Sequence, residues 1–162
     1  MLYFKSMKSP VGELKLVANE TSLTAILWEQ DKPNRVPLDV LHEGINHPVL
    51  LEATRQLQEY FAGKLKKFTV PLSFVGTVFQ QKVWQALTTI PFGETRSYGQ
   101  IAKQIGHDKA VRAVGAANGK NPISIIVPCH RVIGANGTLT GFAGGLAVKA
   151  FLLENESSTF SS

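Results

Sequence analysis

The chain has 162 residues, 44% of them apolar, and a formal net charge of +5, which fits one or two small globular domains with a packed core. It contains no apolar run of about 18 residues, the length that a membrane-spanning helix needs, so we expect no contact with a membrane. The single cysteine excludes an internal disulfide, and the N-terminus lacks the layout of a signal peptide, so we expect a cytoplasmic protein.

The first part of the chain predicts a small sheet followed by a helix. Short apolar-rich segments separated by turn residues predict strands at Leu2–Met7, Glu13–Ala18 and Leu23–Glu29. Residues 31–47 contain prolines and a glycine and are expected to form a loop. From residue 48 to 62 apolar residues recur at helical spacing, which predicts a helix that ends before Gly63. Residues 64–76 have the composition of a crossing between two domains.

A second domain is expected to open at Thr77, where the chain carries signals for the start of a helix. Thr77 and Gln80 form a capping box, and a stripe of apolar residues at helical spacing follows them. Ser97 and Gln100 form a second capping box, and the helix that they open is expected to end at Gly106.

Another helix is expected from Lys109 to about Ala117, with a cap offered by His107 and Asp108. Two short helices joined by a turn that contains glycine are typical of a helix-turn-helix. The second would be the recognition helix, with Arg112 as its prominent cation. Any helical hairpin of a small protein gives the same pattern, so the motif alone leaves both interpretations open.

The charge of the chain is uneven. Residues 1–76 carry 9 Lys/Arg and 8 Asp/Glu, whereas residues 77–162 carry 8 Lys/Arg and 4 Asp/Glu. The second half is therefore the half that would attract a polyanion such as DNA. A basic surface that only keeps the protein in solution is the alternative.

The lone cysteine follows an apolar run. Residues 123–127 predict a buried strand, and Pro128 ends it with a turn, so Cys129 would lie at the mouth of a pocket beside His130 and Arg131. A neighbouring imidazole or cation lowers the pKa of a thiol or accepts its proton, which makes Cys129 the candidate nucleophile. Free cysteines are often inert buried side chains, and that alternative stays open here.

The last part of the chain predicts a loop and a helix. Residues 134–145 are mostly small and are suited to wrap a flat ligand. A helix from Leu146 to Glu156 would end on two carboxylates, Glu154 and Glu156, which is unfavourable for the helix dipole. A partner would explain such a carboxylate, and His130 is the natural candidate, although surface glutamates are usually just solvated. We expect no metal, because one cysteine and four histidines show no zinc-ligand spacing.

Together these residues resemble the O6-alkylguanine-DNA alkyltransferase family. The resemblance is strongest from Thr77 to Glu156, and its most specific motifs are Asn121-Pro122, Pro128-Cys129-His130-Arg131-Val132 and Gly141-Phe142-Ala143-Gly144-Gly145-Leu146. It implies an α/β (α+β) fold with two domains. A small strand-rich, RNase H-like domain and its linker would occupy residues 1–76. A mainly helical domain with the helix-turn-helix and the reactive-cysteine strand would occupy residues 77–162.

The resemblance implies a role for each catalytic residue. Cys129 would attack the alkyl carbon on O6 of a guanine in DNA and keep the group as a thioether, in a single turnover without a cofactor. His130 would be the base, acting through a water, and Glu156 would orient it. Tyr98 would donate a hydrogen bond to N3 of the leaving guanine, and Asn121 would tie the turn before the reactive strand to the helix-turn-helix by side-chain hydrogen bonds.

The resemblance also implies how substrate is reached. The partner would be double-stranded DNA that contains O6-alkylguanine, and O4-alkylthymine is a further candidate. The recognition helix would enter the minor groove, and Arg112 would fill the base stack after the damaged nucleotide has been extruded. Further DNA contacts would come from Ser97, Lys109, Ala110 and Ala116. We expect the protein to be a monomer.

The substrate pocket that the resemblance implies is lined by Val132, Phe142, Ala143, Gly144 and Ser124. Some members of the family carry proline where this chain has Ser124, and we expect the smaller residue to widen the pocket for bulkier alkyl groups. Three rivals remain at this point. They are a lesion-binding protein without chemistry, a helix-turn-helix regulator that senses oxidation or alkylation at Cys129, and a hydrolase with a Cys129–His130–Glu156 triad.

Overall fold

The computed structural model describes residues 1–161, with side chains described as far as residue 157. Its first part is a four-stranded sheet in the order β3-β2-β1-β4. The three predicted strands are present as β1 (Leu2–Ser9), β2 (Gly12–Ala18) and β3 (Leu23–Trp28), and they pair as antiparallel neighbours. Strand β4 (Leu41–Glu43) pairs in parallel with β1. Residues 31–47 are therefore not all loop, because a three-residue edge strand is too short to leave a periodic pattern.

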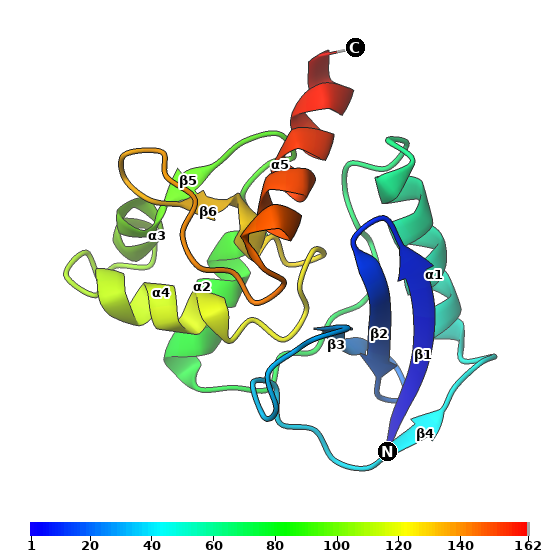
Figure 1. Cartoon of the computed structure of the whole chain (residues 1–162). Coiled ribbons are helices and arrows are strands. Elements are labelled where there is room, and N and C mark those ends of the chain that lie inside the picture. Colours follow the sequence, from blue (N-terminus) through cyan, green and yellow to red (C-terminus); the bar gives the residue numbers. More distant parts are fainter. Residues whose placement is uncertain (162) are drawn as a thin grey trace.

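Helix α1 (Pro48–Phe61) packs against β1 and β2 and starts and stops as the sequence predicts. The His47 side chain accepts a hydrogen bond from the Val49 N–H at 3.2 Å and caps its start. Gly63 has a φ of 76° and ends it in the left-handed conformation that glycine adopts without strain. Figure 1 shows α1 beside the sheet and the remaining helices on the other side of the molecule.

The helical part opens with α2 (Val78–Leu87), and β5 (Arg96–Ser97) leads into α3 (Tyr98–Gln104). Both predicted capping boxes are present, at Thr77 with Gln80 and at Ser97 with Gln100. Helix α4 (Val111–Gly119) begins two residues later than expected, after Ala110, which provides no side-chain cap. The cap predicted at residues 107–108 is therefore wrong, because these residues form the turn in which Ala110 N–H bonds the His107 carbonyl at 2.8 Å.

The predicted reactive-cysteine strand is wrong in conformation, although right in burial. Residues 123–127 form a tight turn, closed by hydrogen bonds from Ile126 N–H to Ser124 O and from Val127 N–H to Ile123 O, both at 2.9 Å. Ile125 at its tip has a φ of 75°. A short apolar run predicts burial but does not separate a strand from another buried conformation. A short 3₁₀ helix (Cys129–Arg131) and β6 (Val132–Ile133), parallel to β5, follow this turn.

Helix α5 (Leu146–Ser161) starts where the sequence predicts and continues past Glu156. The expectation that the helix ends on its two carboxylates is therefore wrong, and the dipole argument does not apply to Glu156. Ser162 lies outside the described residues. Among the helices of residues 1–161, none is both long and apolar enough to cross a membrane.

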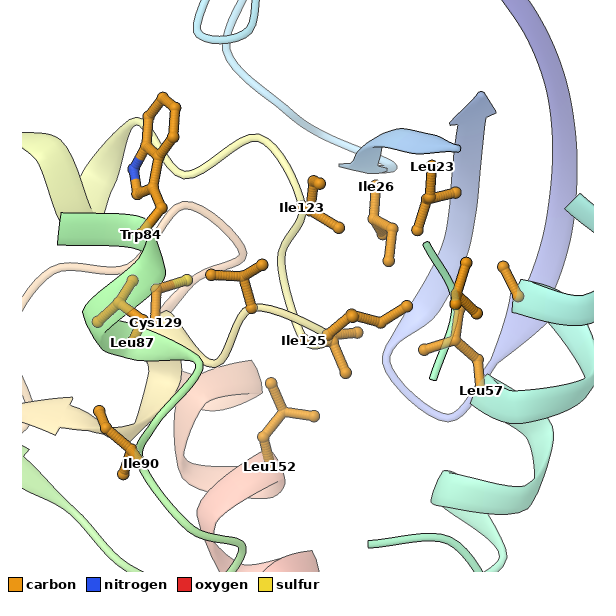
Figure 2. Packing of buried hydrophobic residues seen from close by; sticks show 14 of the residues in the cluster. Leu23, Ile26, Leu57, Trp84, Leu87, Ile90, Ile123, Ile125, Cys129 and Leu152 are labelled. Atoms are coloured by element: carbon orange, nitrogen blue, oxygen red, sulfur yellow. The ribbon is translucent and has the colours of Figure 1, made fainter. Parts of the chain in front are cut away.

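One apolar cluster runs through both parts of the chain and includes the cysteine. Strand β3 meets the buried turn where Ile26 N–H bonds the Pro122 carbonyl at 2.8 Å and Ile26 forms a bridge with Ile123. Figure 2 shows Cys129 in the same cluster as Leu87 of α2 and Ile125 of the turn. The reactive segment is thus held between the sheet and α2.

Candidate active site

Cys129 is the first residue of the short 3₁₀ helix and is 4% exposed. Its backbone N–H bonds the Val127 carbonyl at 2.8 Å, and its own carbonyl accepts a bond from Asn118 Nδ2 at 3.4 Å. Burial raises the pKa of the thiol. Hydrogen bonding from the Asn121 and Ser124 side chains lowers this pKa, and so do the positive charges of Arg35 and Lys149. The sulfur is therefore a thiol in its resting state that needs a base to react.

The structure brings His130 and Glu156 together, as the sequence predicts. The distance between His130 Nε2 and Glu156 Oε2 is 2.6 Å, and both side chains are fully buried. A carboxylate accepts from an N–H, so this contact places the imidazole proton on Nε2 and leaves Nδ1 as the acceptor. Nδ1 has no hydrogen-bond partner among the described residues. The neutral ring thus has one nitrogen free to accept a proton, and the ring belongs to the residue that follows Cys129 in the chain.

Glu156 accepts hydrogen bonds from other groups besides His130. Arg131 donates to it through Nε at 2.8 Å and through Nη2 at 3.2 Å, and the Gly93 N–H lies at 3.4 Å. The Tyr60 hydroxyl of α1 donates to Oε2 at 2.6 Å. Burial raises the pKa of Glu156, but His130 and Arg131 outweigh it and lower the pKa to about 2. The carboxylate is therefore charged throughout the physiological range.

The groups around His130 set its pKa and therefore its protonation state at pH 7. Burial lowers the pKa of His130, and the charges of Arg131 and Lys149 lower it further, while Glu156 raises it. The net effect is a pKa below the ordinary value of 6.5. His130 is therefore neutral at pH 7, which is the state that a base needs.

Asn121 ties the buried turn together. Its Nδ2 donates to the Val127 carbonyl at 2.8 Å, and its Oδ1 accepts from the Ile123 N–H at 3.0 Å. The expected side-chain link to the helix-turn-helix is therefore wrong, because the side chain bonds within the turn, and it is the backbone N–H of Asn121 that bonds the Asn118 carbonyl of α4 at 3.2 Å. Asn121 thereby fixes both ends of the segment that leads to Cys129.

Two buried cations near the cysteine were not predicted from the sequence. Arg35 forms an ion pair with Asp31 at 2.6 Å and donates to the Asn121 carbonyl at 2.9 Å. Lys149 of α5 is fully buried and donates to the carbonyl oxygens of Val132 at 2.7 Å and Thr140 at 3.4 Å. A lysine inside an otherwise apolar stretch of the last helix is a weak signal for the second, whereas nothing marks Arg35.

A hollow of about 1090 Å³ lies beside Arg35, which forms part of its wall. Its walls come from residues 34–40, the start of the chain and the edge of α2. No residue of the cysteine–histidine–glutamate group lines it. We therefore do not place the reacting base there.

The predicted pocket residues come from the buried turn, from β6 and from the loop before α5. Val132 and Ser124 are buried, and Phe142, Ala143 and Gly144 are half-buried. The Tyr98 hydroxyl shares a hydrogen bond with Thr140 Oγ1 at 2.5 Å.

Trp28, a residue of β3 that the sequence did not point to, donates its Nε1–H to Ser124 Oγ at 3.2 Å. An indole thus lies on Ser124, where we expected a small residue to open free space.

The predicted DNA contacts other than Ser97 lie on or just before α4. Arg112, Lys109 and Ala116 are exposed, and Ala110 is half-buried. Ser97 lies at the start of α3, where its hydroxyl already accepts the Gln100 N–H at 3.1 Å. Figure 1 shows α3 and α4 as neighbours at the side of the molecule away from the sheet.

Two family models match the chain and together span most of it. Residues 2–74 match the ribonuclease-like domain of 6-O-methylguanine DNA methyltransferase, and residues 78–158 match the DNA binding domain of the same protein.

Individual relatives match over nearly the whole chain. A methylated-DNA–protein-cysteine methyltransferase of Methanosarcina acetivorans is 52% identical, over 97% of this chain and 99% of the relative. A constitutive one of Bacillus subtilis is 50% identical, over 96% of each. A crystal structure of Mycobacterium tuberculosis OGT in complex with DNA superimposes with a TM-score of 0.90 at 48% identity, covering 97% of this chain and 94% of that one.

Proposed function

The chain belongs to the 6-O-methylguanine DNA methyltransferase family and is a DNA-binding repair methyltransferase, and we propose that Cys129 is the residue that receives the alkyl group. The observation that carries this assignment is that His130, the residue directly after the chain's single cysteine, is buried and hydrogen-bonded to Glu156 of α5. The free Nδ1 of His130 gives the thiol proton a place to go. The predicted α+β fold and the predicted activity are both confirmed by the family matches.

The reaction follows from these groups. His130 Nδ1 takes the proton of Cys129 through one water, and Glu156 stabilises the imidazolium that forms. The sulfur attacks the alkyl carbon, so an S–C bond forms while the bond from that carbon to O6 breaks. The electron pair of the broken bond goes to the guanine, and a hydrogen bond from Tyr98 to N3 offsets the developing negative charge. The products are a thioether on Cys129 and a guanine anion, which takes up one proton from water at N1 to become unmodified guanine, while the imidazolium of His130 returns its proton to water.

Access to the base requires extrusion from the duplex. The O6 substituent is hidden in a stacked base pair, and flipping the nucleotide costs a few kcal/mol. In this proposal Arg112, which is exposed on α4, enters the stack and fills the vacated space. Tyr98 must exchange its bond with Thr140 for one with the guanine. The preferred partner in this proposal is a duplex with O6-alkylguanine, with O4-alkylthymine as a second substrate, bound by a cytoplasmic monomer.

The proposal is tested on the DNA product. Excess duplex with O6-methylguanine is incubated with the protein, and the restored guanine is quantified after digestion of the DNA. We expect restoration to stop at one guanine per protein, because a thioether has no group in the site that would remove it. Continued turnover beyond one equivalent would contradict the assignment of Cys129 as the final acceptor.

The regulator that senses damage without repairing it is the weaker alternative. It would restore no guanine and would bind one DNA sequence in preference to others. The relatives that match nearly the whole chain are named as methyltransferases, which favours repair.

A further inference from the structure

A tryptophan from the sheet reaches the serine that lies beside the reactive cysteine. Trp28 ends β3, is 7% exposed, and donates Nε1–H to Ser124 Oγ at 3.2 Å. The two residues are 96 positions apart in the chain, so the contact exists only because the sheet packs on the buried turn. Ser124 itself is 1% exposed, which removes water as a competitor for its hydroxyl.

The chemistry of the two groups fixes the direction of the contact. An indole nitrogen only donates, whereas a hydroxyl has one proton and two lone pairs. The bond from Trp28 therefore occupies a lone pair of Ser124 and leaves the hydroxyl proton for another acceptor. Ser124 forms a bridge with Val127, whose carbonyl accepts the Cys129 N–H, so the serine lies on the segment that leads to the sulfur. Its hydroxyl also acts against the rise that burial causes in the pKa of the Cys129 thiol, and we therefore take the sulfur as the acceptor.

The tryptophan ring is itself held by the loop of residues 134–145, which carries Phe142 and Gly144. Its ring packs edge-on against Phe142, with centroids 5.5 Å apart and an interplanar angle of 67°. A Cβ at Gly144 would approach the indole to 2.8 Å, so the loop comes as close to the ring as a residue without a side chain allows. The indole N–H thus has little freedom to turn away from Ser124.

We propose that Trp28 is a positioning residue for the alkyl transfer, which donates its indole N–H to Ser124 and so directs the serine proton at the sulfur of Cys129. The hydroxyl then stabilises the thiolate at the moment of attack, and the methylated sulfur no longer needs it. The inference rests on the proposed function of Cys129. It assigns to the strand-rich part of the chain a role in the chemistry of the helical part.

The test measures the reactivity of the sulfur without DNA. Because the chain has one cysteine, each iodoacetamide adduct found by intact mass reports on that thiol, and the pH dependence of its rate gives the thiol pKa. Ser124→Ala removes the hydroxyl, and Trp28→Phe removes the indole N–H while it keeps a ring. We expect each to raise the thiol pKa, by up to about one unit, which is an about tenfold loss of thiolate at fixed pH.

A double variant separates a relay from two independent effects. If Trp28 acts through Ser124, then Trp28→Phe adds nothing to Ser124→Ala, and the double variant has the pKa of Ser124→Ala alone. Additive shifts, or an unchanged pKa in either single variant, would overturn the inference. Replacement of Trp28 by benzothienylalanine, which keeps the bicyclic ring and lacks the N–H, gives the same readout if Trp28→Phe does not fold.

Trp84→Phe is the matched control. Trp84 is buried and donates its Nε1–H to the Ala117 carbonyl at 2.8 Å, so its replacement removes a comparable buried hydrogen bond that involves neither Ser124 nor Cys129. We expect a lower unfolding midpoint with an unchanged thiol pKa. The iodoacetamide readout needs no alkyl transfer, so a failure of the proposed function would appear in the guanine assay and leave this result independent.

Discussion

The helical part of the chain, residues 78–158, holds every residue that we propose to touch the substrate, whereas the strand-rich part, residues 2–74, holds residues that support them. The supporting residues each donate a hydrogen bond to the helical part: Trp28 to Ser124, Arg35 to the Asn121 carbonyl, and Tyr60 to Glu156. Each of these three side chains is buried, and its hydrogen bond joins the strand-rich part to the helical part. The comparison indicates that the first part of the chain sets the hydrogen bonding of the site without entering the reaction.

This division makes a graded prediction. Changes in the helical part should remove a step of the reaction, and changes in the strand-rich part should shift its rate or its pH dependence. The predictions below run from the largest expected effect to the smallest.

Glu156→Gln should have the largest effect. The variant weakens the support of His130 as a base, and we expect the single-turnover rate of methyl transfer to fall by about 100-fold or more. It also leaves Arg131 buried without its charge partner, which costs about 3–5 kcal/mol of unfolding free energy. Rapid-quench assays and urea unfolding measure the two effects. Glu154→Gln, an exposed change on the same helix, is the control, and equal rates in the two variants would contradict the assignment.

Arg112→Ala should slow repair of a duplex by about tenfold to 100-fold, because extrusion of the base costs a few kcal/mol. The free base O6-benzylguanine needs no extrusion, so its rate should stay close to that of the unchanged protein. Lys8→Ala removes an exposed cation on β1 and controls for net charge. Equal slowing on duplex and free base would show that Arg112 acts in some other way.

The pH dependence reports on His130. Because burial lowers its pKa below 6.5, the imidazole is neutral at pH 7 and becomes protonated only as the pH falls below that value. We expect a rate that is unchanged just above pH 6.5 and that falls by about tenfold per pH unit on the acid side of the lowered pKa. A rate that is flat from pH 8 to pH 5 would argue against His130 as the base.

Tyr60→Phe should have a smaller effect that sharpens the comparison. It keeps the buried ring and removes one of the donors to Glu156, at a cost of about 1–2 kcal/mol of stability. The carboxylate then holds the imidazolium more strongly, which raises the pKa of His130 and moves the acid limb of the rate profile to higher pH. Tyr3→Phe, on the partly buried Tyr3 of β1, is the control. A rate loss as large as that of Glu156→Gln would break the division between support and chemistry.

The sequence predicted those features whose signal is local. The capping boxes at Thr77 and Ser97 and the glycine after α1 each depend on residues within a few positions, and all three appear in the structure. The contact between His130 and Glu156 was also predicted, through the family resemblance and a last helix whose start, but not its end, was correct.

The features that the sequence did not predict depend on distant contacts. The turn at residues 123–127 is fixed by Asn121 and by its bridge to Ile26, neither of which shows in an apolar run. Trp28, Arg35 and Tyr60 look like ordinary sheet, loop and helix residues until the two parts of the chain pack together. No periodicity marks a hydrogen bond between residues 96 positions apart.

The central claim is tested most directly by the mass of the intact protein after it has been mixed with duplex DNA that contains O6-methylguanine. We predict a gain of one methyl group, on the peptide that holds Cys129, and no gain for Cys129→Ser or with undamaged DNA. An unchanged protein mass while the guanine in the DNA is restored, or a methyl group on any other residue, would contradict the account.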